Sequence, residues 1–152
     1  MKSIDLVLLL VLTGLPVSNA QQISEWREEN RTGVSSETGL MRSWPADGPN
    51  LLWSNLQLPT GYSSVTFGDD VMYTTGLKDE DDILVALDMN GKILWEKVMG
   101  RAWTGSSPES RATPTVEGNR VYTCSGYGDI ACFDGTTGEI IWSYKASEMN
   151  RG

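Results

Sequence analysis

The chain has 152 residues, no histidine and a formal net charge of −8 at neutral pH. The lack of histidine excludes His-based catalytic triads, His metal sites and His general bases. The acidic balance, without a basic stripe, argues against nucleic acid as a partner. Six Trp and 16 Gly are many for this length. Glycine serves tight turns and tryptophan serves large packing surfaces, so the composition indicates many short strands rather than helices.

Residues 1–20 predict a secretion signal. Lys2 supplies the positive charge, residues 6–12 (LVLLLVL) form the apolar run, and residues 18–20 (SNA) supply small residues for cleavage after Ala20. The run is far shorter than the roughly 20 apolar residues of a membrane span. We therefore expect an exported protein, periplasmic or extracellular, without a membrane span.

Residues 21–50 carry several Gly and Pro and no regular periodicity, which predicts an extended lead-in with turns. Leu51–Ser54 is then predicted to be a short strand. Trp53 stands 42 residues before Trp95, as Trp95 stands 47 before Trp142. We therefore expect Leu51–Ser54 to be the outer strand of a blade whose other strands lie elsewhere, a clasp that removes a free sheet edge.

From residue 62 onward the sequence repeats, in units of about 62–98 and 111–145. Four strands separated by turn residues are expected in each unit: 63–67, 71–75, 83–88 and 92–98, then 112–116, 120–125, 129–134 and 139–145. Four short strands per 40–50 residues is about the period of a β-propeller blade. The predicted fold class is therefore all-β, with residues 51–152 forming a partial propeller of about two blades plus an N-terminal clasp strand.

The sharpest motif is residues 131–142 (ACFDGTTGEIIW), with a shorter copy at residues 86–95 (ALDMNGKILW). Both resemble the A-x-D-x-x-T-G-x-x-x-W repeat of the pyrroloquinoline quinone (PQQ) propeller family. In such a motif Asp accepts backbone N–H bonds in the turn, Gly allows a positive φ, and the Trp ring fills the gap between blades. The predicted structural residues are Asp88, Gly91, Trp95, Asp134, Thr137, Gly138 and Trp142.

The lead-in adds a second resemblance. Residues 26–27 (WR), 30–35 (NRTGVS), 44–45 (WP) and 48–53 (GPNLLW) look like the start of secreted bacterial PQQ-like propeller proteins. The family includes PQQ-dependent alcohol and polyvinyl-alcohol dehydrogenases, which hold PQQ and Ca²⁺ on the central axis. It also includes cofactor-free propellers that act as protein-interaction platforms, and the fold alone does not choose between them.

The dehydrogenases use an adjacent Cys-Cys disulfide, which this chain lacks. The leading hypothesis is therefore a non-catalytic exported platform, a fragment of a longer protein, whose partners are other proteins or the remaining blades of the same propeller. No catalytic or metal-binding residue and no cofactor are assigned to this piece. The alternative is the N-terminal part of a PQQ-dependent dehydrogenase, in which PQQ and Ca²⁺ would be held by the full-length protein.

Three further groups of residues could bind a ligand or a metal ion or form a disulfide. Residues 101–103 (RAW) and 109–111 (ESR) lie on the connection between the units and are read as a solvated loop, with ligand contact as the alternative. Residues 79–82 (DEDD) are read as a solvated acidic turn rather than a Ca²⁺ site. Cys124 and Cys132 are expected on adjacent strands. A turn centred on Tyr127 would place Cys124 opposite Ile130 and Cys132 opposite Tyr122, which makes the thiols diagonal neighbours and favours two buried thiols over a disulfide; a shift of the turn by one residue would place them opposite each other.

Overall fold

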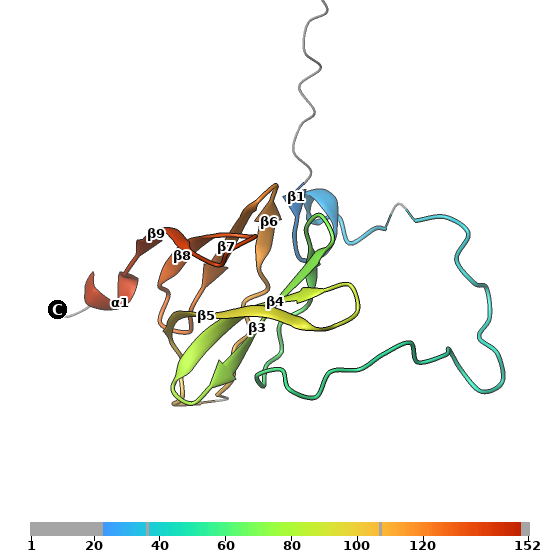
Figure 1. Ribbon diagram of the computed structural model, residues 1–152, viewed down its shortest axis with the longest axis horizontal. Helices are drawn as coiled ribbons and strands as arrows, with labels where there is room; N and C mark the ends of the chain where they lie inside the picture. Colours follow the sequence, from blue (N-terminus) through green and yellow to red (C-terminus); the bar gives the residue numbers. More distant parts are fainter. Residues whose placement is uncertain (1–22, 36, 107, 150–152) are drawn as a thin grey trace, which may run out of the picture.

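The computed structural model describes residues 23–35, 37–106 and 108–149 and contains two antiparallel sheets (Figure 1). The predicted signal lies outside these residues. The first sheet has the order β2-β3-β4-β5, and the second has the order β1-β6-β7-β8-β9. In the first sheet, β2 is Thr66–Phe67, β3 Val71–Lys78, β4 Asp81–Asp88 and β5 Ile93–Arg101. In the second, β1 is Ile23–Ser24, β6 Thr115–Glu117, β7 Arg120–Cys124, β8 Ile130–Asp134 and β9 Ile140–Tyr144.

The two repeat units therefore form four strands each, which pair in chain order and are consistent with two blades. This confirms the predicted all-β class and the two-blade organisation. The hairpin β3–β4 is longer than expected and continues to the pair Lys78↔Asp81. We call the first sheet blade 1 and strands β6–β9 blade 2. A 3-10 turn, Glu29–Arg31, and a short helix, α1 (Ala146–Met149), complete the described elements.

The main core lies between the blades. The facing residues are Tyr73, Leu84, Ala86 and Met99 of blade 1 and Val116, Val121, Ala131 and Phe133 of blade 2. A second cluster, formed by Met72, Ile83, Val85 and Leu87, covers the other face of blade 1, where Leu58 of the lead-in packs on it. Strand β4 is thus buried on both faces, which explains its unbroken apolar run ILVAL.

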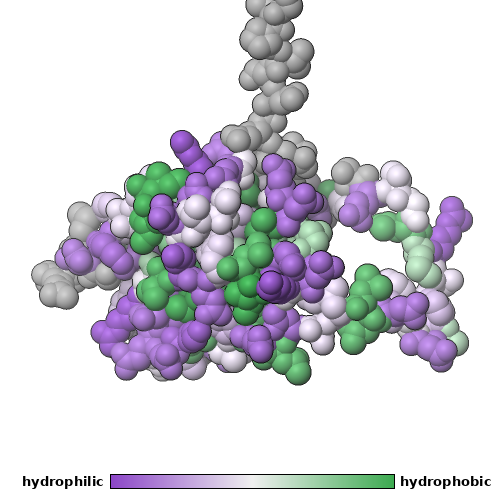
Figure 2. Space-filling model, viewed as in Figure 1, coloured by the Kyte–Doolittle hydropathy of each residue, from purple (hydrophilic) through white to green (hydrophobic). Residues whose placement is uncertain are grey.

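Blade 2 is covered on one face only. Every residue of β9 is exposed, including Ile140, Trp142 and Tyr144. Figure 2 shows hydrophobic residues scattered over the sheets and along the lead-in, among hydrophilic ones. The apolar surface that blade 1 hides in the interblade core has no such cover at the corresponding place on blade 2.

The lead-in departs from the prediction in one respect. Its start is not merely extended, because Ile23–Ser24 adds a fifth strand to the second sheet by pairing with β6. Residues 51–54 form no strand within the described part of the chain, where no other strand pairs with them. The strands that this clasp is predicted to complete belong to another blade, so its pairing stays a prediction. Residues 34–35 and 37–58 lie in a long loop to one side of the sheets (Figure 1).

Candidate functional site

The turn of blade 1 between β4 and β5 is organised by Asp88. Its carboxylate Oδ1 accepts the backbone N–H groups of Asn90 and Lys92, both at 2.9 Å. Gly91 follows with φ of 80°, a conformation that costs a residue with a Cβ. The Asp and Gly of this copy of the motif therefore shape the hairpin and present no group for chemistry.

Asp134 organises the corresponding turn of blade 2 and accepts more hydrogen bonds than Asp88 does. Its Oδ1 accepts the N–H groups of Thr136 at 3.0 Å and Thr137 at 2.8 Å, and the Thr137 hydroxyl at 3.1 Å. Its Oδ2 accepts the Asn119 amide at 2.8 Å. The Thr137 N–H, followed by the other donors, lowers the pKa of Asp134 below its ordinary value. Gly138 ends the turn with φ of 70°.

The Trp95 ring of blade 1 lies on this turn of blade 2. Its Nε1 donates to the Gly135 carbonyl at 3.2 Å, and the Tyr73 hydroxyl donates to the same oxygen at 3.1 Å. The two ring centroids are 5.9 Å apart. A Cβ at Gly138 would lie 2.8 Å from the Trp95 ring, so only glycine leaves room for it. The aromatic pair thus fastens blade 1 to the turn of blade 2.

Trp53 has the same relation to blade 1. A Cβ at Gly91 would lie 2.5 Å from its ring. The Asn55 amide donates to the Gly91 carbonyl at 2.7 Å. Although residues 51–54 form no strand here, Trp53 occupies on the turn of blade 1 the place that Trp95 occupies on the turn of blade 2.

The Tyr73 hydroxyl gives a test of this junction. Burial, with Asp134 and Asp69 nearby, raises the pKa of Tyr73 to about 12. A folded-state pKa above the unfolded value of about 10 means that the unfolded chain loses its proton first, so this contribution to stability is lost as pH rises from about 10 towards 12. We expect Tyr73→Phe to cost about 1 kcal/mol at pH 8 and to weaken the alkaline loss of stability. Thermal melts between pH 8 and 11 measure both, and an unchanged alkaline slope in the variant would contradict the assignment.

Blade 2 carries a second aromatic pair, but no turn lies on it. Tyr122 and Trp142 have ring centroids 6.1 Å apart, close to the 5.9 Å of Tyr73 and Trp95. We define the open face as Tyr122, Ile130, Cys132, Trp142 and Tyr144, which the register places on one side of blade 2. Trp142, Ile130 and Tyr144 are 45%, 42% and 50% exposed.

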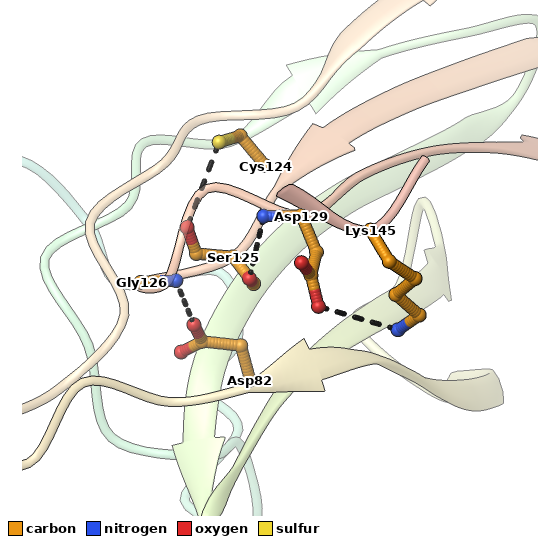
Figure 3. Close-up of polar contacts among 6 residues, drawn as sticks. All are labelled: Asp82, Cys124, Ser125, Gly126, Asp129 and Lys145. Atoms are coloured by element: carbon orange, nitrogen blue, oxygen red, sulfur yellow. Dashed lines mark hydrogen bonds and ion pairs between the residues drawn. The ribbon is translucent and has the colours of Figure 1, made fainter. Parts of the chain in front are cut away.

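A polar cluster lies between the blades where β4 begins (Figure 3). Asp82 is buried, and its Oδ2 accepts the Gly126 N–H of blade 2 at 2.6 Å. Beside it, Asp129 accepts Lys145 at 3.3 Å, and its N–H donates to the Ser125 hydroxyl at 3.2 Å. Burial raises the pKa of Asp82, and the Gly126 hydrogen bond offsets part of that rise.

This cluster borders a cavity of about 250 Å³, which we call the junction pocket. Among its lining residues are Asp82, Trp103, Glu109, Arg111, Cys124 and Ser125. The connection between the blades is exposed at most of its described residues, as the sequence indicated. It is buried at Ala102 and Ser110, and it supplies Trp103, Glu109 and Arg111 to the lining of the pocket. The prediction of a solvated acidic turn is wrong for Asp82, which belongs to β4 and is 2% exposed.

A larger cavity of about 460 Å³ lies where the lead-in meets the inner strands. Its charged groups are already engaged within the chain. The Arg31 Nε lies 2.7 Å from Glu25, and the Arg111 guanidinium lies 5.9 Å from the Tyr62 ring centroid. The junction pocket is therefore the more informative of the two.

The cysteines have the predicted register, with Cys124 opposite Ile130 and Cys132 opposite Tyr122. Both thiols are free. Cys132 is buried under the open face, but Cys124 is exposed, contrary to the expectation of two buried thiols. Burial, and to a smaller extent the nearby carboxylates Asp129 and Asp82, raises the pKa of Cys124, so its thiol is a poor nucleophile at neutral pH.

The described residues do not fit the quinone machinery that part of the family uses. Nowhere in the described ranges do three His, Cys, Asp or Glu side chains come together as metal ligands. Trp95 is committed to the Gly135 carbonyl and Trp53 to the Gly91 turn. We therefore derive no reaction step through PQQ or Ca²⁺.

Two comparisons with known proteins agree with this geometry. Residues 80–152 match the family model described as outer membrane protein assembly factor BamB. An outer membrane protein assembly factor BamB from Shewanella oneidensis is 27% identical over 128 residues, covering 77% of this chain and 31% of that protein. The matched segment thus spans about a third of the relative's length. None of the helices in the described part is long and apolar enough to cross a membrane. Over residues 80–152 the chain is therefore similar to the PQQ-like β-propeller repeat proteins of the BamB type.

Proposed function

We propose that this chain is part of an exported, non-catalytic β-propeller that serves as a binding or assembly platform for other proteins. In this proposal residues 51–152 are the propeller piece, residues 1–20 are a signal peptide, and the seven motif residues act structurally. The supporting observation is that the motif residues contact turns and rings of neighbouring elements. Asp88 and Asp134 hold hairpins, and Trp95 fastens one blade to the next.

The open face of blade 2 is the surface that we propose to bind a partner. Its Tyr122 and Trp142 repeat the Tyr73–Trp95 pair, which in blade 1 is covered by blade 2. Exposed aromatic and aliphatic side chains at one place favour association with protein. We propose that a further blade, or a partner protein that presents a similar turn, covers this face.

A cofactor titration separates the platform from the rival dehydrogenase. We expect the mature protein, given PQQ and Ca²⁺, to show no saturable quenching of tryptophan fluorescence and no dye-linked alcohol oxidation. A quinone bound near any of six Trp would quench them. Stoichiometric, Ca²⁺-dependent quenching that is lost in the Asp79→Ala, Asp81→Ala double variant would overturn the platform.

Crosslinking tests the platform function directly. A photo-crosslinking amino acid replaces Tyr144 on the open face, and the control carries the same amino acid in place of Leu52. Leu52 is 89% exposed on the lead-in, outside the open face. In the exporting host we expect Tyr144 to crosslink to a polypeptide, and the mass of the adduct distinguishes a partner protein from further blades of the same chain. Equal crosslinking from both positions would contradict a specific role of the open face.

A further inference from the structure

The junction pocket contains an unsatisfied charged group. Three buried side-chain atoms in the described part have no hydrogen-bond partner: Thr66 Oγ1, Thr123 Oγ1 and Asp82 Oδ1. The first two belong to neutral hydroxyls. Only the third belongs to a carboxylate, and Asp82 also lines the cavity. A buried carboxyl oxygen without a hydrogen-bond partner is costly, so such an oxygen beside a cavity points to a donor that enters from outside.

The donors that surround the pocket are committed elsewhere. The Thr75 hydroxyl donates to the Ala112 carbonyl at 2.7 Å and accepts the Ser110 proton at 3.0 Å. Ser110 also lies near enough to Asp82 to lower the pKa of that carboxyl, but the bond to Thr75 takes its proton, and Asp82 Oδ1 is left without a partner. Lys145 pairs with the neighbouring buried carboxylate, Asp129. The Arg111 guanidinium lies over the Tyr62 ring, on the side of the larger cavity.

Asp129 shows how the fold satisfies a carboxylate at this place. It is 4% exposed and forms an ion pair with Lys145, the first residue after β9. Asp82, 2% exposed and across the same cluster, has the backbone N–H of Gly126 on one oxygen and nothing on the other (Figure 3). The two carboxylates differ in that only Asp129 has a cation.

The walls of the pocket suit a cation carried on an alkyl chain. Trp103 is 46% exposed and offers an indole surface, against which methylene groups and a cationic head both pack favourably. Glu109 adds a second carboxylate, so the lining carries two negative groups against Arg111. A volume of about 250 Å³ lies below the range of about 300–1,000 Å³ that holds drug-sized ligands. The net charge of −8 also favours the approach of a cation.

We propose that the junction pocket binds the side chain of a lysine or arginine of a partner protein, with its nitrogen donating to Asp82 Oδ1 and its stem against Trp103. This inference rests on the platform function and adds the chemistry of the partner, a basic residue on an exposed segment. It also gives the interblade connection a role, because that connection supplies Trp103 and Glu109.

The test uses the full mature chain and three capped tripeptides, Ac-Gly-Lys-Gly-NH₂, Ac-Gly-Arg-Gly-NH₂ and the norleucine peptide of the same length. The Gly126 amide, bonded to Asp82, is the reporter in ¹H–¹⁵N spectra. We expect saturable shifts of Gly126 with the lysine or arginine peptide, at a dissociation constant on the order of 1 mM for one isolated side chain. The norleucine peptide should give none. The cationic peptide that binds more tightly identifies the preferred head group.

Asp82→Asn keeps an acceptor for Gly126 and removes the charge, so we expect it to weaken binding at least about tenfold. Asp79→Asn is the matched control, because Asp79 is exposed in the same hairpin and does not line the junction pocket. If Asp82→Asn does not fold, Glu109→Gln and Trp103→Leu, which each remove one wall, should each weaken binding severalfold.

Three results would contradict the proposal that the junction pocket binds a basic side chain. They are equal shifts of the Gly126 amide with the norleucine peptide, an unchanged peptide affinity in Asp82→Asn or in both wall variants, and no saturable shift with either cationic peptide. None of these three results tests the platform function, which is tested separately by the PQQ titration and by crosslinking from the open face.

Discussion

Trp95→Ala should lower the free energy of unfolding by about 3 kcal/mol, the range for removing a well-packed tryptophan. The ring lies between the blades, its Nε1 donates to Gly135, and it packs beside Tyr73. Its loss removes apolar contact and leaves the Gly135 carbonyl with one donor instead of two. Chemical denaturation followed by far-ultraviolet circular dichroism measures the change.

Trp142→Ala is the control, because Trp142 holds the same position in the repeat but lies on the open face. In this chain its removal should cost less than about 1 kcal/mol, as for other surface substitutions. A cost equal to that of Trp95→Ala would mean that the open face is already covered, for instance by self-association. Sedimentation of both variants decides between these explanations.

The fold was predictable because its strongest signals are local. Each turn is specified by an Asp that accepts backbone N–H groups and a Gly with positive φ, and each copy lies within about a dozen residues. Repetition at the spacing of a blade then implies the architecture, since each unit needs a neighbour to cover its apolar face. The turn limited the register of Cys124 and Cys132 to two alternatives, and the structure has the one centred on Tyr127.

The pairing of Ile23–Ser24 with β6 could not be read from the sequence. The two partners are separated by more than 90 residues, as in Ile23↔Glu117, and a two-residue strand has no periodicity of its own. The predicted clasp strand at Leu51–Ser54 stays a prediction. Its composition is that of a strand, but a strand forms only where a ladder partner lies beside it, and the predicted partners belong to another blade.

Asp82 was the main omission in the site. Within the run DEDD it looks like one of four solvated carboxylates, and only the register of the β3–β4 hairpin shows that it lies inside β4. Its partner, Gly126, is 44 residues away on the other blade. A weak sequence signal was present, because Asp82 directly precedes the buried run ILVAL and alternation within a short hairpin turns one acidic residue inward.

Gly138→Ala should be strongly damaging for a conservative substitution in a turn. An alanine at φ of 70° costs about 1–2 kcal/mol in backbone strain, and its Cβ would lie 2.8 Å from the Trp95 ring. Overpacking of this kind adds about 1–3 kcal/mol, because the ring must leave its place on the turn. We expect a total loss of about 3 kcal/mol in the free energy of unfolding.

Gly128→Ala separates the two contributions. Gly128 has φ of 83°, in the hairpin between β7 and β8, and a Cβ there would meet only Ala146 at 3.7 Å, an ordinary contact. It should therefore show the backbone cost alone, about 1–2 kcal/mol. If Gly138→Ala cost no more than Gly128→Ala, Trp95 would not be seated on the turn.

The Trp95→Ala, Gly138→Ala double variant tests whether these two residues are energetically coupled. Once Trp95 is alanine, Gly138→Ala no longer displaces a ring, and its additional cost should fall to that of Gly128→Ala. The two single costs would then exceed the cost of the double variant by about 1–3 kcal/mol, the coupling expected of residues in contact. Additive costs would instead mean that the glycine and the tryptophan act independently and that the two blades are fastened elsewhere, at Asp82 and Gly126.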